Sequence, residues 1–297
     1  MKPPPFDYVA AATLDEALHA LAEGGEDAKV LAGGQSLIPL MSLRLARPSL
    51  LVDVTRAEEL GAVERGAEAF RIGATVCHRR VERSAEVRNC VPLIADAMPL
   101  VGHVAIRTRG TIGGSLAHAD PAAELPAVAL ALGATFTVRS RDRGERAIAA
   151  DDFFQGYFTT ALEPDEILTA ISFPIAGPNN GFAIEEVARR HGDFAMVGAA
   201  IALTVTDGTI VDARVAMINA AERPVRATAA EEALRGASVN SDGGGFADAA
   251  AAAVGELEPS GDLHASPAYR RKVAAVCVRR GLERAAAQAK NQESERA

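Results

Sequence analysis

Two adjacent glycines stand between an apolar stretch and a serine, and this arrangement suits a bound anion. The segment is Ala32, Gly33, Gly34, Gln35, Ser36 and Leu37. A glycine pair lets the backbone turn sharply and approach a ligand, and the start of a following helix offers unpaired N–H groups at its positive end. The segment lacks G-x-G-x-x-G spacing and a Walker-type lysine. By itself it predicts either a phosphate site or an ordinary turn.

A second glycine-rich segment lies further along the chain. It contains Arg109, Gly110, Thr111, Ile112, Gly113, Gly114 and Ser115 and is followed by Asp120 and Glu124. Exposed amides and hydroxyls are the donors that a pyrophosphate needs, and the two carboxylates could accept from ribose or ribityl hydroxyls. The alternative is a loop that caps a helix beginning after Pro121, with Asp120 as its N-cap.

Two such segments, each flanked by hydroxyl residues, suggest a ligand with two linked phosphates held from both sides. FAD satisfies that requirement. The three cysteines, Cys77, Cys90 and Cys277, are far apart and form no C-x-x-C pair, so we expect any iron–sulfur cluster to lie on another chain. No H-E-x-x-H or G-x-S-x-G motif predicts a metal site or a catalytic triad on this chain.

Composition excludes several other classes of function. The chain has 297 residues and a formal net charge of -8, which is the wrong sign for neutralising a nucleic-acid backbone. No apolar stretch is long enough to span a membrane, and the N-terminus has no signal-peptide core. These features predict a cytoplasmic protein that has no membrane span and does not bind nucleic acid.

The elements that must position the two segments follow from hydrophobic periodicity and breakers. A capping-box pattern predicts a helix over 13–23, and apolar runs predict strands over 29–32 and 50–54, with a helix capped by Ser36 between them. These elements form a first lobe, about 1–55. The second lobe, about 56–176, should contain strands over 69–73, 135–138 and 167–173, helices around 76–100, and the glycine-rich segment as a loop.

A cluster of prolines, glycines and asparagines at 174–181 predicts a linker. Beyond it we expect a second domain over 177–290, with an antiparallel hairpin that turns at Asp207 and Gly208, followed by helices at 226–235, 246–256 and 267–288. Residues 291–297 should be a frayed polar tail. The predicted class is α+β.

Three stretches carry a family resemblance. Residues 32–37 and 106–121 resemble the two FAD motifs of the medium subunit of the carbon monoxide dehydrogenase and xanthine dehydrogenase family, and residues 185–195 resemble a third stretch of that family. The resemblance implies a two-lobed FAD-binding domain of the vanillyl-alcohol-oxidase (PCMH) type over 1–176, followed by a smaller α+β domain with an antiparallel sheet and helices. Thr108 stands where many relatives have asparagine, and Glu185 lies near a lysine position of xanthine-dehydrogenase-like members.

The resemblance also implies roles for particular residues. Residues 32–36 and 111–115 would hold the pyrophosphate of FAD. The ribityl or adenosine portion would lie beside His118, Asp120 and Glu124. Leu168 and Phe194 would pack near the isoalloxazine or the adenine.

The implied activity is electron transfer within a molybdenum hydroxylase. FAD would receive electrons from the [2Fe-2S] clusters of a small partner subunit and pass them to an external acceptor, while a large molybdenum-binding subunit oxidises the substrate. The assembly would be a dimer of heterotrimers, and no side chain here would be catalytic. The alternatives are a stand-alone FAD-dependent oxidase or dehydrogenase and a cofactor-free scaffold subunit.

Overall fold

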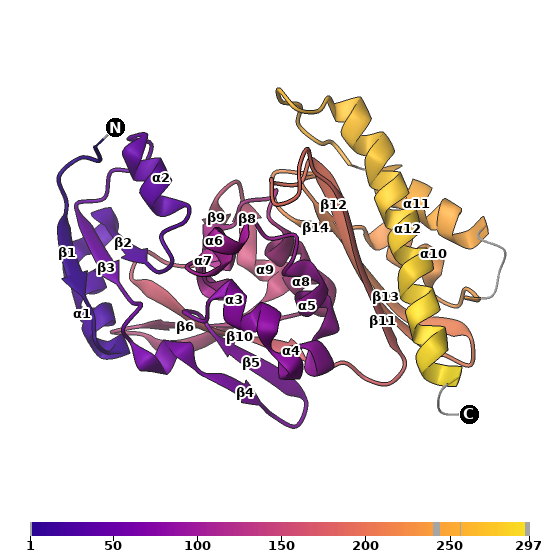
Figure 1. Ribbon diagram of the computed structural model, residues 1–297, viewed down its shortest axis with the longest axis horizontal. Helices are drawn as coiled ribbons and strands as arrows, with labels where there is room; N and C mark the ends of the chain where they lie inside the picture. Colours follow the sequence, from indigo (N-terminus) through magenta and orange to yellow (C-terminus); the bar gives the residue numbers. More distant parts are fainter. Residues whose placement is uncertain (1, 240–243, 256, 295–297) are drawn as a thin grey trace.

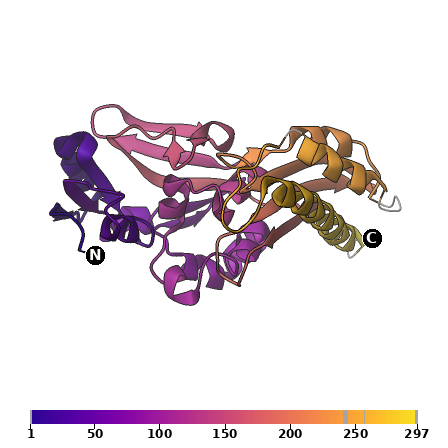
Figure 2. The same cartoon turned by 90° about the horizontal axis from the view of Figure 1, so that it is seen from above.

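Three structural units lie in a row in the computed structural model of the chain, which describes residues 2–239, 244–255 and 257–294. The N-terminal lobe is at one end, a second lobe occupies the middle, and the C-terminal unit with its long final helix is at the other end (Figure 1). The view from above shows the same order (Figure 2). None of the helices in the described ranges combines the length and apolar character that a bilayer crossing needs.

The N-terminal lobe is a parallel sheet with strand order β1-β3-β2. Its elements are β1 (Asp7–Ala10), α1 (Leu14–Gly24), β2 (Ala28–Leu31), α2 (Leu37–Ser42) and β3 (Leu50–Asp53). Thr13 caps α1, because its hydroxyl accepts a hydrogen bond from the amide of Glu16 at 3.2 Å. Both predicted helices and both predicted strands are present, and β1 is an additional strand that pairs along β3.

The second lobe contains an antiparallel sheet with strand order β4-β5-β10-β6-β7, and helices of this lobe lie between that sheet and the C-terminal unit (Figure 1). The strands are β4 (Val63–Arg65), β5 (Ala69–Gly73), β6 (Thr135–Ser140), β7 (Gly144–Ala149) and β10 (Glu166–Pro174), with a short pair β8 (Phe154–Gly156) and β9 (Thr159–Thr160). The helices are α3 (His78–Arg83), α4 (Ala85–Cys90), α5 (Pro92–Ala97), α6 (Val104–Arg107), α7 (Ile112–His118), α8 (Glu124–Leu132) and α9 (Ala150–Phe153).

The helices predicted around 76–100 are present as α3, α4 and α5, since Ser84 starts α4 as its N-cap and Pro92 starts α5. One prediction for this lobe needs correction. The glycine-rich segment, expected as a loop, enters α7 at Ile112, so that Gly113, Gly114 and Ser115 are helical. Isolated glycines weaken a helix by about 1 kcal/mol each relative to alanine, so the sequence argued against a helix that tertiary packing stabilises.

The C-terminal unit is an antiparallel sheet, β11-β12-β13-β14, covered by helices. Its elements are β11 (Asn180–Val187), β12 (Val197–Thr206), β13 (Thr209–Ile218), β14 (Val225–Arg226), α10 (Thr228–Leu234), α11 (Gly244–Gly255) and α12 (Pro267–Ser294). The predicted hairpin turn is present, with Asp207 and Gly208 both at positive φ, as a type I′ turn requires.

This sheet is buried on both faces over part of its length. Helix α12 packs on one face, and α5 and α8 of the second lobe pack on the other. All residues from 197 to 201 are consequently buried, although simple alternation predicts one exposed face. The second lobe and the C-terminal sheet therefore share one hydrophobic core.

The predicted linker lies between β10, which ends at Pro174, and β11, which begins at Asn180. A domain boundary after residue 176 remains our proposal. The tail begins later than predicted, since α12 continues to Ser294; residues 295–297 lie outside the described residues.

Candidate functional site: an FAD cleft between the lobes

One large cleft lies where the three units meet. Its volume is about 1020 Å³, at the upper end of the roughly 300–1,000 Å³ typical of ligand pockets. Every residue that the sequence singled out for cofactor binding lines it, with the exception of Ile112. Those that line it are Ala32, Gly33, Gly34, Gln35, Ser36, Leu37, Thr111, Gly113, Gly114, Ser115, His118, Asp120, Glu124, Leu168 and Phe194.

The first glycine segment presents free backbone donors to this cleft. In the part of the chain that the structure describes, the amides of residues 33–37 donate no hydrogen bond to protein. Gly34 has φ 70°, in the left-handed region that favours glycine. The side-chain amide of Gln35 donates to the carbonyl of Gly33 at 2.9 Å and so fixes the turn. A run of unpaired amides at a helix start is an anion-binding arrangement.

Ser36 does not cap α2, contrary to the prediction. It stands at the N-cap position, but its backbone is already helical and its hydroxyl accepts no capping bond. Because an N-cap needs extended backbone to reach the amides of the first turn, those amides stay available to a ligand.

The second glycine segment uses its amides differently. The amide of Ile112 donates to the carbonyl of Val76 at 3.0 Å, and that of Gly113 donates to Ala74 at 2.9 Å. Two of the amides that the prediction assigned to a pyrophosphate therefore hold α7 against the end of β5. The Ile112 side chain is fully buried in the core. The expectation of free amides at these two positions is wrong.

The start of α7 offers hydroxyls to the cleft. Thr111 caps the helix, accepting from the amide of Gly114 at 3.0 Å, and its hydroxyl hydrogen is still available for donation. The amide of Ser115 donates to the carbonyl of Thr111, while its side chain lines the cleft. The hydroxyls of Thr111 and Ser115 are therefore the donors that this segment can supply.

The two glycine segments touch each other. A Cβ at Gly33 would overlap the carbonyl of Arg109 and lie 2.7 Å from the Cα of Gly110. Only glycine at position 33 permits this approach, which brings the first turn of lobe one against the second lobe. The two segments are far apart in the sequence, but together they form one floor of the cleft.

Asp120 forms a turn and does not start a helix. Its carboxylate accepts from the amide of Ala122 at 2.9 Å, and α8 begins only at Glu124, after Ala123. The N-cap alternative for Asp120 is therefore wrong. Its side chain lines the cleft, which leaves it available to hydroxyl groups of a ligand.

Glu124 is a buried acid in the cleft wall. Its side chain is 4% exposed, and burial, together with Glu186 and Asp120 nearby, raises the pKa of Glu124 to about 8. Burial also raises the pKa of Glu186, on β11, to about 7. At neutral pH Glu124 is consequently a protonated acid that can donate a hydrogen bond as well as accept one.

Two histidines line the cleft in different states. His78 is buried with no hydrogen-bond partner for either ring nitrogen among the described residues, and burial lowers its pKa to about 4. An orphaned buried group of this kind calls for a ligand or water. His118 is half-buried, burial lowers its pKa, and its ring lies 5.0 Å from that of Phe158.

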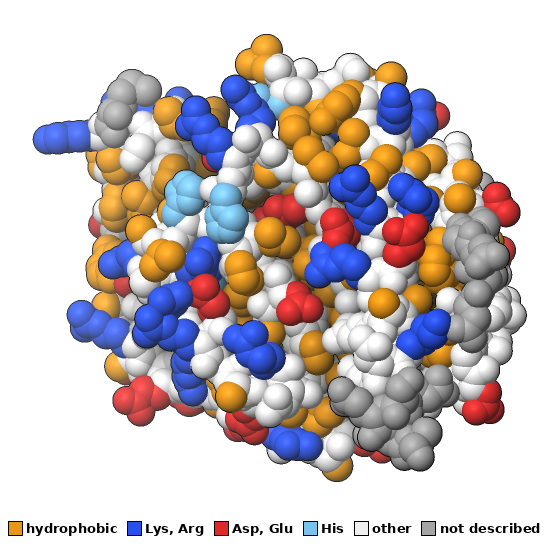
Figure 3. Space-filling view, turned by 45° about the vertical axis from the view of Figure 1, so that its right-hand side comes forward, with side chains coloured by type: hydrophobic (Ala, Val, Ile, Leu, Met, Phe, Trp, Pro, Cys, Tyr) orange, Lys and Arg blue, Asp and Glu red, His pale blue; other side chains and the backbone are white. Residues whose placement is uncertain are grey.

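The C-terminal unit closes the cleft on its far side. Phe194 is largely exposed in the loop between β11 and β12, whereas Leu168 is buried on β10 opposite. Asn219 holds the base of this loop by donating to the carbonyl of Ala195 at 2.7 Å, and it accepts from Arg270 of α12 at 3.0 Å. Acidic and basic side chains are interspersed over the surface seen from this side (Figure 3).

Several lining residues escaped sequence reasoning. Lys29 precedes the first glycine segment on β2, and His78 and His103 face the cleft from the second lobe. None belongs to a recognisable spacing, so only the three-dimensional arrangement identifies them. Glu185, which departs from the family pattern, pairs with Arg284 of α12 and lies outside the cleft.

Comparison with known families decides the cofactor. Residues 4–176 match the family described as "FAD binding domain in molybdopterin dehydrogenase", and residues 182–285 match "CO dehydrogenase flavoprotein C-terminal domain". The chain belongs to this flavoprotein family. FAD is its cofactor, and the chain is a subunit of an oxidoreductase.

Individual relatives cover nearly the whole chain. It is 44% identical to the caffeine dehydrogenase subunit beta of Pseudomonas sp. (strain CBB1), and the match covers 82% of each chain. It is 37% identical over 98% of its length to the complete carbon monoxide dehydrogenase medium chain of Afipia carboxidovorans. A chain of carbon monoxide dehydrogenase from Hydrogenophaga pseudoflava superposes with a TM-score of 0.94 at 37% identity, covering 97% of this chain and 99% of that one.

The residues of the cleft fit FAD. The free amides of 33–37 and the hydroxyls of Thr111 and Ser115 suit a pyrophosphate. Gly33 lies so close to the backbone of Arg109 and Gly110 that a side chain at position 33 would have no room beside these donors. The resemblance inferred from the motifs is therefore confirmed at the level of family, fold and cofactor.

Proposed function

We propose that this chain is the electron-transfer subunit of a molybdenum-containing hydroxylase or dehydrogenase. It would receive electrons from the [2Fe-2S] clusters of a small partner chain and deliver them to an external acceptor, while a large molybdenum-binding chain oxidises the substrate. The observation that carries the proposal is the cleft itself, which has the donors for a dinucleotide but, among the described residues, no group of three or more metal-ligating side chains.

The residues of this chain bind and orient FAD, which when bound stores two electrons and exchanges them one at a time. The amides of 33–37 and the hydroxyls of Thr111 and Ser115 would hold its pyrophosphate. Asp120 and Glu124 would hold hydroxyl groups of the ribityl or ribose portion. Leu168 and Phe194 would exclude water beside a ring.

The sequence supports assigning the clusters to a partner. Three dispersed cysteines cannot ligate a [2Fe-2S] cluster, which takes four thiolates in its common form. Relatives named as medium chains or subunits of dehydrogenases are parts of larger complexes. We further propose that two heterotrimers associate and that the complex is cytoplasmic.

The test is anaerobic mixing of the FAD-loaded chain with its reduced [2Fe-2S] partner in a stopped-flow instrument. We expect the flavin absorption band to bleach as the cluster spectrum returns to its oxidised form. A flavin that the cluster chain does not reduce, but that a small organic substrate reduces in the isolated chain, would identify a stand-alone oxidase or dehydrogenase. Analytical ultracentrifugation of the purified complex tests the proposed dimer of heterotrimers.

A further inference from the structure

A buried arginine forms part of the cleft wall on the C-terminal unit. Arg270 lies in the first turn of α12 and lines the cleft, yet only 3% of its side chain is exposed. Its Nη1 donates to Oδ1 of Asn219 at 3.0 Å, and its Nη2 donates to the carboxylate of Asp262 at 2.5 Å. Its Nε is buried and has no hydrogen-bond partner among the described residues. Protein acceptors therefore compensate the charge of Arg270 only in part.

The position of Arg270 in its helix is unfavourable unless negative charge lies nearby. The start of α12 is the positive end of the dipole of a helix of 28 residues. Cations stabilise the opposite end of a helix, so an arginine in the first turn places like charge beside like charge. A helix N-terminus and a buried guanidinium together favour a negative charge in the adjoining cleft.

Asn219 fixes Arg270 between segments that line the cleft. The side-chain amide of Asn219 donates to the carbonyl of Ala195, which follows Phe194, at 2.7 Å. The backbone amide of Asn219 donates to the carbonyl of Pro121, in the second lobe, at 2.8 Å. The guanidinium is thus held in one place by contacts that reach two walls of the cleft, and a fixed charge of this kind is what electrostatic stabilisation requires.

Asp262 offsets the charge of Arg270 incompletely. The side chain of Asp262 is 46% exposed, so that water screens its charge. Its Oδ1 also accepts from the backbone amides of His264 and Ala265, at 2.7 and 2.9 Å. Because a buried charge is screened much less than an exposed one, the guanidinium of Arg270 dominates the field of this pair inside the cleft.

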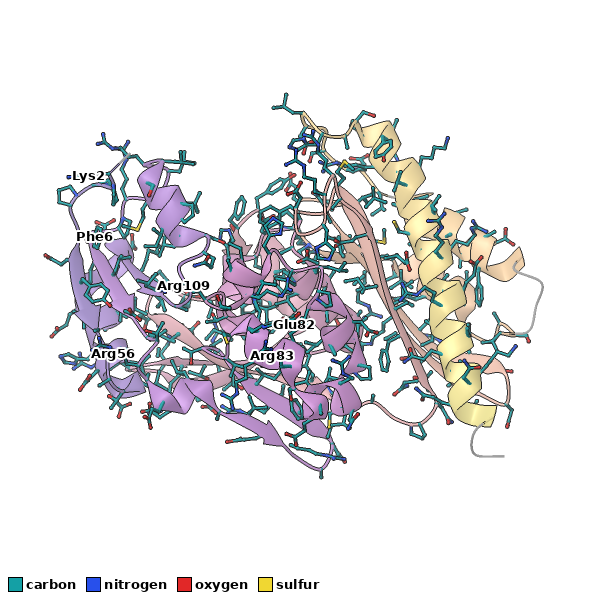
Figure 4. All side chains as sticks on the ribbon, in the orientation of Figure 1. Lys2, Phe6, Arg56, Glu82, Arg83 and Arg109 are labelled. Atoms are coloured by element: carbon teal, nitrogen blue, oxygen red, sulfur yellow. The ribbon has the colours of Figure 1, made fainter. Side chains whose placement is uncertain are left out.

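The remaining charged side chains of this wall have opposite signs. Arg189 is exposed, Asp193 is partly buried, and both line the cleft from the loop between β11 and β12. Two other arginines, Arg83 and Arg109, are labelled in Figure 4; they lie away from the start of α12 and do not line the cleft. Of the charged side chains that the described C-terminal unit presents to the cleft, Arg270 is therefore the most buried.

The pyrophosphate of FAD does not account for Arg270. The free amides of residues 33–37, which suit the phosphates, belong to the N-terminal lobe, at the other end of the row of units from α12 (Figure 1). Arg270 is instead linked through Asn219 to Ala195, beside Phe194, which is a candidate for packing against a ring. We therefore expect the negative charge that Arg270 favours to arise on the flavin ring.

We propose that Arg270 is the cation that stabilises the reduced flavin in this chain. This inference rests on the proposed function, in which FAD accepts electrons in the cleft. Two electrons from the cluster partner and one proton from solvent leave a flavin with one more negative charge than its oxidised form. A fixed positive charge in the cleft wall favours that form and raises the midpoint potential of the bound FAD. Arg270 acts through its field and needs no contact with the ring.

The test measures the midpoint potential of FAD bound to the full chain, by anaerobic titration against a dye of known potential. Arg270→Gln removes the charge and keeps a hydrogen-bond donor. We expect it to weaken binding of reduced FAD relative to oxidised FAD by about tenfold, which lowers the potential of a two-electron couple by about 30 mV. Arg270→Lys keeps the charge and should restore most of the potential. Arg271→Gln is the matched control, because Arg271 is the next residue of α12 but donates to the carbonyl of Leu257 outside the cleft.

Asp262→Asn tests the same charge with the opposite sign. The substitution removes the partner carboxylate of Arg270 and keeps an oxygen that can accept from the amides of His264 and Ala265. The midpoint potential should therefore rise. The change should be smaller than that of Arg270→Gln, because Asp262 is partly exposed.

Flavin content and the thermal unfolding midpoint establish that each variant is folded and loaded. An unchanged potential in Arg270→Gln would overturn the proposal, as would equally weakened binding of oxidised and reduced FAD or an equal shift in Arg271→Gln. A lowered potential that Arg270→Lys does not restore would assign Arg270 a packing role instead. If Arg270→Gln does not fold, an unchanged or lowered potential in Asp262→Asn overturns the proposal. The potential is measured without partner chains, so a wild-type flavin that the cluster chain does not reduce would count against the proposed function alone.

Discussion

The two glycine segments of the cleft resemble each other in sequence but differ in what their backbones do. Among the described residues, the amides of residues 33–37 have no protein hydrogen-bond partner, and these residues line the cleft. The amides of Ile112 and Gly113 instead donate to the carbonyls of Val76 and Ala74. We propose that the first segment is a ligand cradle, whereas the second is mainly a joint between a helix and a sheet. Glycine content alone therefore does not reveal which of the two roles a segment has.

The difference follows from what each glycine touches. A Cβ at Gly113 would overlap the backbone of Ala74, so that this glycine allows α7 to pack against the end of β5. Gly34 has only side-chain atoms near its Cβ position, but its φ of 70° sets the direction of the following amides. Substitutions at the two sites should consequently separate folding from cofactor binding.

The largest effect is expected at the joint. Gly113→Ala forces the backbone of α7 away from Ala74 and should lower the free energy of unfolding of the apo chain by about 2–4 kcal/mol. Urea denaturation followed by circular dichroism measures it. Gly156→Ala, where no atom lies within 4 Å of the new Cβ, is the control and should be nearly neutral. A Gly113→Ala chain of normal stability that merely loses flavin would make the second segment a cradle like the first.

Gly34→Ala tests the cradle. The new Cβ strains a left-handed residue and turns the adjacent amides, so we expect FAD affinity to fall on the order of tenfold or more, while stability falls by only about 1 kcal/mol. Flavin fluorescence titration of the apo chain provides the affinity. Gly236→Ala is the control, because Gly236 also has a positive φ, 80°, with open space around the new Cβ, but lies outside the cleft. Equal loss of FAD in both variants would remove the distinction between the segments.

Much of the fold could be predicted because its signals are local. The capping box at Thr13 and Glu16, the apolar run at 69–73 and the turn at Asp207 and Gly208 lie within a few residues of the elements they specify. Strand β1 escaped because it is short, follows three prolines and is stabilised by β3, more than forty residues away. Helix α7 was not predicted because its Gly113 is required by close packing against Ala74, a tertiary contact that the local sequence does not reveal.

The residues that line the candidate site could be predicted from the sequence, but their burial and protonation could not. The motifs gave the segments that line the cleft, yet nothing in the spacing of Glu124 indicated a 4% exposed side chain facing Glu186 from a different domain. The same limit applies to His78, which becomes an unpartnered buried group only through the packing of Gly110 against its ring. Burial, and with it protonation, is a property of tertiary structure.

Glu124 extends the comparison to the helix that follows the joint. Burial raises the pKa of Glu124 from 4.5 to about 8 in the folded chain. The contribution of its protonated carboxyl to the free energy of unfolding is therefore fully present below pH 4.5 and is lost as pH rises through 8. Glu124→Gln removes this dependence. Thermal unfolding of the apo chain should show a smaller loss between pH 5.5 and pH 8.5 in the variant, by several degrees on the order expected for one buried carboxyl. Parallel pH profiles would mean that Glu124 is ionised in the apo chain.

The smallest effects are expected at the two helix starts, and they sharpen the comparison most directly. Thr111 accepts a capping bond from Gly114, so Thr111→Ala should destabilise the apo chain by about 1 kcal/mol. Ser36 makes no such bond, and Ser36→Ala should change stability by less than about 0.5 kcal/mol. If instead Ser36→Ala costs as much as Thr111→Ala, the serine caps α2 in solution and the amides of the first segment are not free.

Thr13→Ala, which breaks a comparable cap far from the cleft, provides the reference value for a cap in this chain. Unequal costs at residues 36 and 111 would show that the apo chain keeps one set of amides available for FAD and commits the other to its own fold.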